Sequence, residues 1–289
     1  MMTLNRCLAQ FWSTYRQLSP SAQQIQQILS GQEPPINDHI AFRTLNLDPI
    51  QIGQIAQPFL KCGYQTKGNY IFTAKKLQAK HFEHPKSAYP KIFISQLQVD
   101  QFSPFVQDVA QVIKQQVADT QSPTDGLFLT SGRCWPIQKQ IYDQLLAESE
   151  YAAWLYVFGF VPNHFTILVN QLSDLTDLAS VNQRLKDHGF CINDSGGEIK
   201  GSPSVGLEQS STLAAQLPVQ FDDLREPISI PACYYEFAKR YHGFSGFVTD
   251  SADKIFETQV DSNTLEISAS NSVPCPIMTH NKTTFLRLK

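Results

Sequence analysis

The sequence predicts an α+β fold in which two βαβββ modules pack side by side as an incomplete barrel, flanked by helices. Three observations predict it. A strand-like segment opens each half of the chain, each is followed by a helical segment and then a cluster of strand-like segments, and a stretch with helical periodicity separates the halves. Because inward-pointing side chains converge in such a barrel, residues far apart in the sequence can share one site.

The first half begins with an N-terminal helical flank, residues 1–33, in which apolar residues such as Leu4, Leu8 and Phe11 recur on one helical face. The first module is expected over residues 34–100. Its elements are a strand at 39–45, a helix from Asp48-Pro49 to about Gly63, and strands at 69–72, 76–82 and 91–97. This order is one βαβββ unit.

A helical connector is expected over residues 101–150, with helices at 104–119 and 136–150. The second module follows at residues 151–260, and residues 261–289 are a C-terminal extension. The expected elements of the second module are a strand at 155–170, a helix at 175–188, and strands near 197–199, 206–209, 218–224 and 232–237. The βαβββ order therefore occurs twice.

Composition excludes several classes of protein. The formal net charge is -3, from 23 basic and 26 acidic residues without a long run of either sign, so nucleic acid is not an expected partner. The uncharged run at 151–173 contains Pro162, Asn163 and His164 and alternates like a strand, so no membrane partner is expected either. The N-terminus lacks the features of a secretory signal, which predicts a cytoplasmic protein. The oligomeric state stays open.

The strand at 39–45 carries the first candidate site residues. Residues two apart on a strand share a face, so His39, Ala41 and Arg43 should lie on one side. Ala41 is small and leaves room for a ligand across that face. A hydrogen-bonded core histidine is the structural alternative for His39, and an ion pair with Asp38 or Glu236 is the alternative for Arg43.

His164 and Glu236 are the other two candidates. His164 shares a strand face with Thr166, and Glu236 lies in the apolar segment 232–238. A buried ionisable group needs a partner, because its desolvation costs several kcal/mol. For His164 the alternatives are a structural hydrogen bond or a metal. For Glu236 they are a metal or a salt bridge with one of three basic residues, Arg225, Lys239 or Arg240. Two histidines and a glutamate together can form a facial site with open coordination positions.

Other features carry less weight. His81 and His84 have a spacing that could bind metal, but their charged neighbours favour a solvated hairpin. Ser210 and Ser211 are expected to be exposed polar residues at the surface, in preference to donating hydrogen bonds to a substrate. Arg225 and His242 could be outer partners of Glu236. The chain has no CxxC pair and no nucleotide-binding glycine motif.

Three stretches contain the candidate ligands: Asp38-His-Ile-Ala-Phe-Arg-Thr-Leu45, Gly159-Phe-Val-Pro-Asn-His-Phe-Thr166 and Cys233-Tyr-Tyr-Glu-Phe-Ala-Lys-Arg240. They resemble the 2-oxoadipate dioxygenase/decarboxylase family, also called hydroxyglutarate synthase, in a short form. That family belongs to the vicinal oxygen chelate superfamily, which includes glyoxalases. The resemblance covers about residues 35–260 and implies a glyoxalase-like fold built around one metal site.

The resemblance also implies roles. His39, His164 and Glu236 would bind Fe(II), and Arg43 would hold a substrate carboxylate. A 2-oxo acid and O2 would be the partners, and 2-oxoadipate would be converted to 2-hydroxyglutarate and CO2. A planar guanidinium suits this task, because it can bind a carboxylate by two parallel hydrogen bonds.

Two rival functions remain open at this point. The same residues suit zinc or another divalent metal in a glyoxalase-like lyase or hydrolase that does not use O2. A metal-free protein that binds a small molecule in the same cleft is the third reading.

Overall fold

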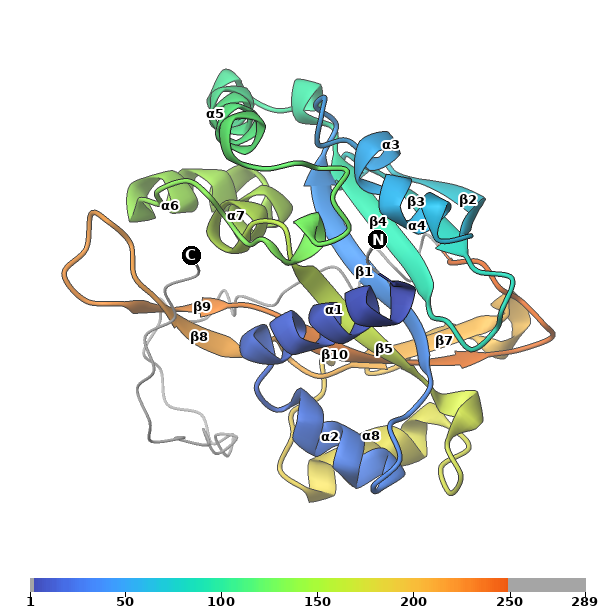
Figure 1. Ribbon diagram of the computed structural model, residues 1–289. Helices are drawn as coiled ribbons and strands as arrows, with labels where there is room; N and C mark the ends of the chain where they lie inside the picture. The colour runs from blue at the N-terminus through green and yellow to red at the C-terminus, as the bar shows by residue number, and fades with distance from the viewer. Residues whose placement is uncertain (1–2, 249–289) are drawn as a thin grey trace.

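The computed structural model describes residues 3–248, so the expected C-terminal extension, 261–289, lies outside the described residues. Helices and strands alternate along the chain in the order expected for two modules (Figure 1). The helices are α1 (Leu4–Leu18), α2 (Ala22–Ser30), α3 (Ile52–Ile55), α4 (Gln57–Lys61), α5 (Pro104–Thr120), α6 (Lys139–Glu148), α7 (Glu150–Phe158) and α8 (Leu178–Asp187). The strands are β1 (Asn37–Leu45), β2 (Gln65–Phe72), β3 (Leu77–Glu83), β4 (Lys91–Leu97), β5 (Pro162–Leu168), β6 (Lys200–Ser202), β7 (Leu207–Ser211), β8 (Gln216–Val219), β9 (Ile228–Pro231) and β10 (Tyr234–Arg240).

One curled sheet of eight strands joins the two modules. Its order is β2-β3-β4-β1-β5-β10-β7-β6, and β1 and β5 form the antiparallel pair at its centre. Outward from this pair, β1 runs parallel to β4 and β5 runs parallel to β10. Each half therefore has its first strand at the centre and its last strand beside it. The prediction of two βαβββ modules in an incomplete barrel is confirmed.

Helices cover the convex face of this sheet. Figure 1 shows α1 crossing β1 and β5, with α2 and α8 side by side beneath it. The predicted apolar face of the first helix is buried here: Phe11 packs edge-on against Phe42, and Tyr15 packs against Phe165. Because odd and even strand positions face opposite ways, burying Phe42 and Phe165 on the helices turns their neighbours to the concave side.

The concave side is closed at both ends. At one end, α7 packs against the central strands, and the Tyr151 hydroxyl accepts a hydrogen bond from the Thr44 N–H. The Trp154 indole N–H donates to the carbonyl of Ala232. At the other end, the segment that follows β10 places the Phe247 ring 4.8 Å from that of His39. Polar groups in between are screened from solvent.

The expected strand at 155–170 is wrong in its first part. Residues up to Phe158 belong to α7, and β5 begins only at Pro162. All residues from 151 to 158 are buried, so this helix is apolar all round and lacks the 3.6-residue pattern that distinguishes a helix from a buried strand. The side chain of Ser149 caps its start by accepting from the Ala152 N–H.

Two further elements differ from the prediction. The single helix expected after Asp48-Pro49 is two short helices, α3 and α4, because Pro58 lacks the N–H that would continue one helix through Ala56. The strand expected at 218–224 stops at Val219 and pairs with β9 in a separate hairpin. The acidic side chain of Asp223 instead accepts from the Lys139 N–H, at the start of α6. The strand expected near 197–199 lies slightly later, as β6.

Candidate metal centre

A β-bulge precedes each candidate histidine. On β1 the pairing with β5 passes from Asn37 to His39 while the partner strand advances one residue, so Asp38 is the extra residue. On β5 the pairing skips Asn163 in the same way, between His164 and Pro162. Bulges bend a strand and redirect its side chains. In both modules the bulged residue reaches the imidazole that follows it.

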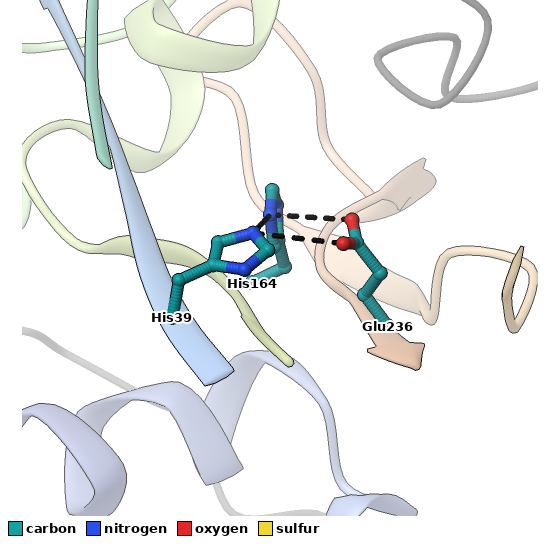
Figure 2. A group of neighbouring side chains, drawn as sticks. All are labelled: His39, His164 and Glu236. Atoms are coloured by element: carbon teal, nitrogen blue, oxygen red, sulfur yellow. Dashed lines mark hydrogen bonds and ion pairs between the residues drawn. The ribbon is translucent and has the colours of Figure 1, made fainter. Parts of the chain in front are cut away.

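His39, His164 and Glu236 converge on the concave face (Figure 2). The two Nε2 atoms lie 3.3 Å apart, and the Glu236 carboxylate oxygens lie 3.5 Å from His39 Nε2 and 3.4 Å from His164 Nε2. The corners of such a triangle are about 2 Å from its centre, which matches metal bonds of about 2.0–2.2 Å to imidazole and carboxylate. The group could hold a metal ion.

Each of the three side chains is oriented by a second polar group. Asp38 Oδ2 lies 2.8 Å from His39 Nδ1, and Asn163 Oδ1 lies 3.0 Å from His164 Nδ1. With Nδ1 donating to these oxygens, both Nε2 atoms present a lone pair to the centre of the triangle. The Gln209 amide donates to Glu236 Oε1 at 2.7 Å. Such outer partners fix the tautomer and the direction of ligands.

The electrostatics of the group suit a cation. Burial, the neighbouring His39 and the positive Arg43 hold the pKa of His164 well below its usual value, which keeps the imidazole neutral. Burial raises the pKa of Glu236, and the nearby His39 and the hydrogen bond from Gln209 only partly oppose this effect. Its predicted alternative partner, Arg240, pairs with Asp38 instead. A buried carboxylate beside the neutral imidazole of His164 would be stabilised by the positive charge that a divalent metal supplies.

Arg43 lies on the same face, four residues along β1 from His39. Its guanidinium stands over the rings of Tyr151 and Trp154, at 5.0 and 4.8 Å from their centroids. The residue is 2% exposed, and within residues 3–248 its Nε and Nη1 have no hydrogen-bond partner. Neither Asp38 nor Glu236 pairs with it, so the ion-pair alternative for Arg43 is wrong. Its role in substrate binding stays a prediction.

The weaker candidates are placed differently from expectation. His81 is not solvated: it is 2% exposed on the concave face, with Nδ1 2.8 Å from the Tyr70 hydroxyl and Nε2 3.2 Å from Glu83. The expectation that Ser210 and Ser211 are exposed at the surface is wrong, because both are buried. Ser210 donates to Asn182 on the helix side, whereas Ser211 faces the other way.

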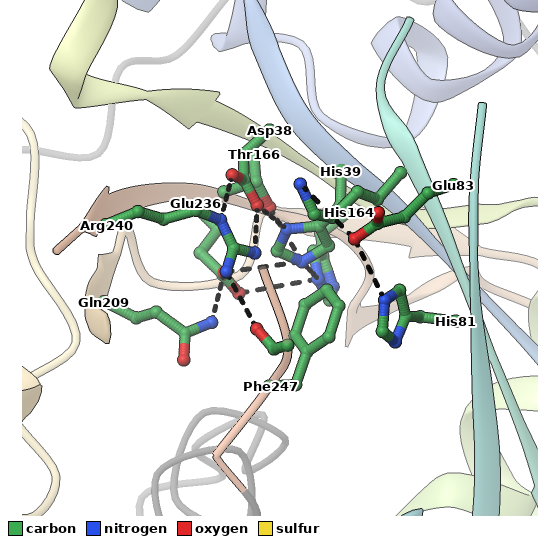
Figure 3. Close-up of polar contacts among 12 residues, drawn as sticks. Asp38, His39, His81, Glu83, His164, Thr166, Gln209, Glu236, Arg240 and Phe247 are labelled. Atoms are coloured by element: carbon green, nitrogen blue, oxygen red, sulfur yellow. Dashed lines mark hydrogen bonds and ion pairs between the residues drawn. The ribbon is translucent and has the colours of Figure 1, made fainter. Parts of the chain in front are cut away.

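Arg225 and His242 are exposed and are not the outer partners of Glu236. Gln209 takes that place on the neighbouring strand. Figure 3 also shows a network that the sequence pattern did not indicate, in which Arg240 clamps the Asp38 carboxylate while Phe247 covers His39. The Arg240 guanidinium further donates to the carbonyls of Phe244 and Gly246. One arginine thus joins the bulge at Asp38 to the segment over the site.

Replacing Asp38 by asparagine should weaken metal binding about 10- to 100-fold, because a neutral amide orients and polarises His39 less than a carboxylate does. Chelator competition measures the affinity. Asp177→Asn is a matched control, since Asp177 caps α8 at the surface and should leave the affinity unchanged. Equal affinity in Asp38→Asn and the wild type would contradict the assigned role.

Replacing Arg240 by methionine should destabilise the protein by about 3–5 kcal/mol at pH 7, because the buried Asp38 carboxylate loses its partner. Although burial opposes ionisation, Arg240 and His39 hold the pKa of Asp38 well below its usual value. The stabilisation from this lowered pKa is complete above the unfolded value of about 3.9 and is lost as the pH falls through the folded-state pKa. The difference in unfolding free energy between the wild type and Arg240→Met should therefore decrease below about pH 4.

Urea unfolding at a series of pH values measures this. Arg184→Met is the control, because Arg184 and Asp174 form a pair at the surface whose loss should cost less than about 1 kcal/mol. A deficit for Arg240→Met as small as that of the control would contradict the prediction.

The fold is glyoxalase-like, and the buried group of His39, His164 and Glu236 could hold a metal ion. A putative glyoxalase-superfamily protein from Ralstonia eutropha shares the fold, with a TM-score of 0.65 and 20% identity over 82% of this chain and 83% of the other. The family model described as 2-oxoadipate dioxygenase/decarboxylase matches residues 7–128 and 127–245. The chain belongs to this family of enzymes.

Individual relatives agree. The chloroplastic 2-oxoadipate dioxygenase/decarboxylase of Arabidopsis thaliana is 34% identical over 284 residues, which cover 87% of this chain and 76% of the relative. The crystal structure of hydroxyglutarate synthase from Oryza sativa in complex with 2-oxoadipate superposes with a TM-score of 0.82 at 32% identity, over 90% of this chain and 93% of that one. A putative hydrolase from Shewanella frigidimarina gives 0.81 at 45% identity, over 86% and 99%.

The cellular compartment is a separate question from the family. Within residues 3–248, no helix is both long and apolar enough to cross a bilayer. The plant relative is described as chloroplastic, and the cytoplasmic location of this chain stays a prediction.

Proposed function

We propose that this chain is a mononuclear Fe(II)-dependent dioxygenase that decarboxylates a 2-oxo dicarboxylate, converting 2-oxoadipate and O2 into 2-hydroxyglutarate and CO2. The observation that carries the proposal is that the triangle of His39, His164 and Glu236 shares its concave face with the buried Arg43, whose Nε and Nη1 have no hydrogen-bond partner among the described residues. A dicarboxylate is the class of ligand that can engage both. A family member from Oryza sativa has been crystallised with 2-oxoadipate.

The proposed division of labour follows from the charges. His39, His164 and Glu236 would hold the iron, which would supply open coordination positions for the 2-oxo carboxylate end of the substrate and for O2. Arg43 would hold the distal carboxylate, its guanidinium positioned against the rings of Tyr151 and Trp154. Asp38 and Asn163 would keep both imidazoles in one tautomer, and Phe247 and α7 would exclude bulk water.

Water exclusion matters for this chemistry. Bound iron would supply the O2 chemistry, and residues that keep bulk water from the site would protect that chemistry from side reactions with solvent. His39, His164 and Glu236 are each no more than 2% exposed. This burial supports a reaction in which both oxygen atoms of O2 are incorporated into the products of one substrate molecule.

Anaerobic purification followed by metal analysis and reconstitution tests the proposal. Iron-reconstituted protein should consume one O2 and release one CO2 per 2-oxoadipate, with 2-hydroxyglutarate as the other product. Turnover that needs a divalent metal but consumes no O2 would replace it with the lyase or hydrolase reading. Absence of both bound metal and turnover after reconstitution would favour the metal-free binding protein.

A further inference from the structure

The hydroxyl of Tyr234 is buried and has no hydrogen-bond partner in the described part of the chain. Tyr234 is 3% exposed and lies on β10, two residues before Glu236 and therefore on the same face. Its neighbour Tyr235 faces the helices, and that hydroxyl accepts from the Gln26 amide at 2.8 Å. Of these two adjacent tyrosines, the one on the concave face has a hydroxyl without a hydrogen-bond partner within the described residues.

Tyr234 occupies a defined place between the two ends of the proposed substrate site. In the sheet register it pairs with His164, which in turn pairs with Ala41. Ala41 lies between His39 and Arg43 on β1. The row formed by Ala41, His164 and Tyr234 therefore separates the row of His39 and Glu236 from the end of the face where Arg43 lies.

The Tyr234 ring stacks on the imidazole of His164, with centroids 4.8 Å apart and planes inclined by 23°. Both side chains rise from neighbouring strands in the same direction. The phenol hydroxyl is buried beside this imidazole, and within residues 3–248 it has no hydrogen-bond partner. The small side chain of Ala41 lies on the same face, in register with His164.

Unpaired buried polar atoms gather at this site. Nine such side-chain atoms occur in the described part of the chain, and six of them belong to concave-side residues around the triangle: Arg43 Nε and Nη1, Asn163 Nδ2, Gln209 Oε1, Ser211 Oγ and Tyr234 Oη. A buried polar group without a partner destabilises the folded state. A ligand that forms hydrogen bonds with several of these atoms at once would explain why they lie close together.

We propose that Tyr234 contacts the substrate directly, its phenol donating a hydrogen bond to an oxygen of the 2-oxo dicarboxylate that extends from the metal centre to Arg43. This rests on the proposed function and adds a residue to it. The contact orients the acid along the concave face and involves no transfer of atoms. Tyr234 is then a determinant of substrate affinity and not of metal affinity.

The pair Tyr234→Phe and Tyr235→Phe tests this, because each variant removes one hydroxyl from the same strand. Three quantities are measured for both variants and the wild type: iron content after reconstitution, the thermal midpoint of the substrate-free protein, and the Kd for 2-oxoadipate by anaerobic calorimetry. Tyr234→Phe should keep the metal, raise the midpoint and weaken 2-oxoadipate binding about 10- to 100-fold, as expected for a bond to a charged group. Tyr235→Phe should lower the midpoint and leave the Kd unchanged.

The outcomes separate the two proposals. Unchanged Kd in Tyr234→Phe, or an equal loss in both variants, would overturn the role of Tyr234 while leaving the proposed function standing. A lower thermal midpoint for Tyr234→Phe would show a structural hydrogen bond and would also overturn it. If the wild type binds 2-oxoadipate without turnover, the proposed reaction fails, and the Kd comparison still decides on Tyr234. If the wild type does not bind it at all, both proposals fall.

Discussion

Replacing His164 by alanine should abolish iron binding and iron-dependent O2 uptake. The variant loses one corner of the triangle formed with His39 and Glu236, and its remaining carboxylate and imidazole cannot enclose an ion from three sides. The loss of metal affinity should exceed about 100-fold, the upper end of the cost of removing an outer partner. Metal analysis after reconstitution and oxygen-electrode measurements follow both effects.

His81→Ala is the matched control for this variant. His81 is also a histidine buried on the concave face, but its ring nitrogens face Tyr70 and Glu83. It should lose stability through the cavity left behind and keep its metal. Full metal content and activity in His164→Ala would refute the proposed ligand set.

Replacing Arg43 by methionine should weaken binding of 2-oxo dicarboxylates by about 2–5 kcal/mol, because the distal carboxylate would be buried without its charged partner. A 2-oxo monocarboxylate of equal chain length should bind the variant no worse than it binds the wild type. The ratio of the two Kd values isolates the distal contact from the metal. Since Arg43 has unpaired nitrogens in the substrate-free protein, the variant should also unfold at a higher temperature.

Arg43→Lys provides the second comparison. It keeps the positive charge but loses the planar donor geometry and part of the stacking on Tyr151 and Trp154. Its affinity for dicarboxylates should fall between those of the wild type and Arg43→Met. Equal selectivity for dicarboxylates in all three proteins would mean that Arg43 does not hold the distal carboxylate.

Much of the site follows from strand alternation. The two-residue period placed His39 and Arg43 on one face of β1, and the structure has both there, opposite Phe42, which packs on α1. The repeated βαβββ order explained how a strand near residue 40 and one near residue 165 could meet. They form the central pair of the sheet. Period and order are local signals, so a single sequence contains them.

The residues that orient the ligands could not be predicted in this way. Alternation assigns Asp38 and Asn163 to the face opposite the histidines that follow them, whereas the bulges redirect both toward the imidazoles. A bulge is a property of the pairing of two strands, which neither strand shows alone. Likewise, alternation places Tyr234 and Tyr235 on opposite faces of the strand, but the hydrogen bond from Gln26 to the Tyr235 hydroxyl depends on how the helices pack and could not be predicted.

The helix α7 was missed for a different reason. Its residues are buried on every side, so no polar face reveals a helical period, and the apolar run merged with the strand that follows. Because this helix was not predicted, the contacts of its Tyr151 and Trp154 with Arg43 were not predicted either. A fully buried helix is the element that periodicity detects least well.

The position of the triangle on the central strand pair links the metal to the cohesion of the molecule. His39 belongs to the first module, whereas His164 and Glu236 belong to the second, and β1 and β5 are the strands through which the modules join. An ion bound there would act as a cross-link between the two halves of the chain. Removal of the ion by a chelator should then weaken the contact between β1 and β5 before either half unfolds. The rate of proteolysis in the connector between the two halves should therefore report how much of the protein holds metal.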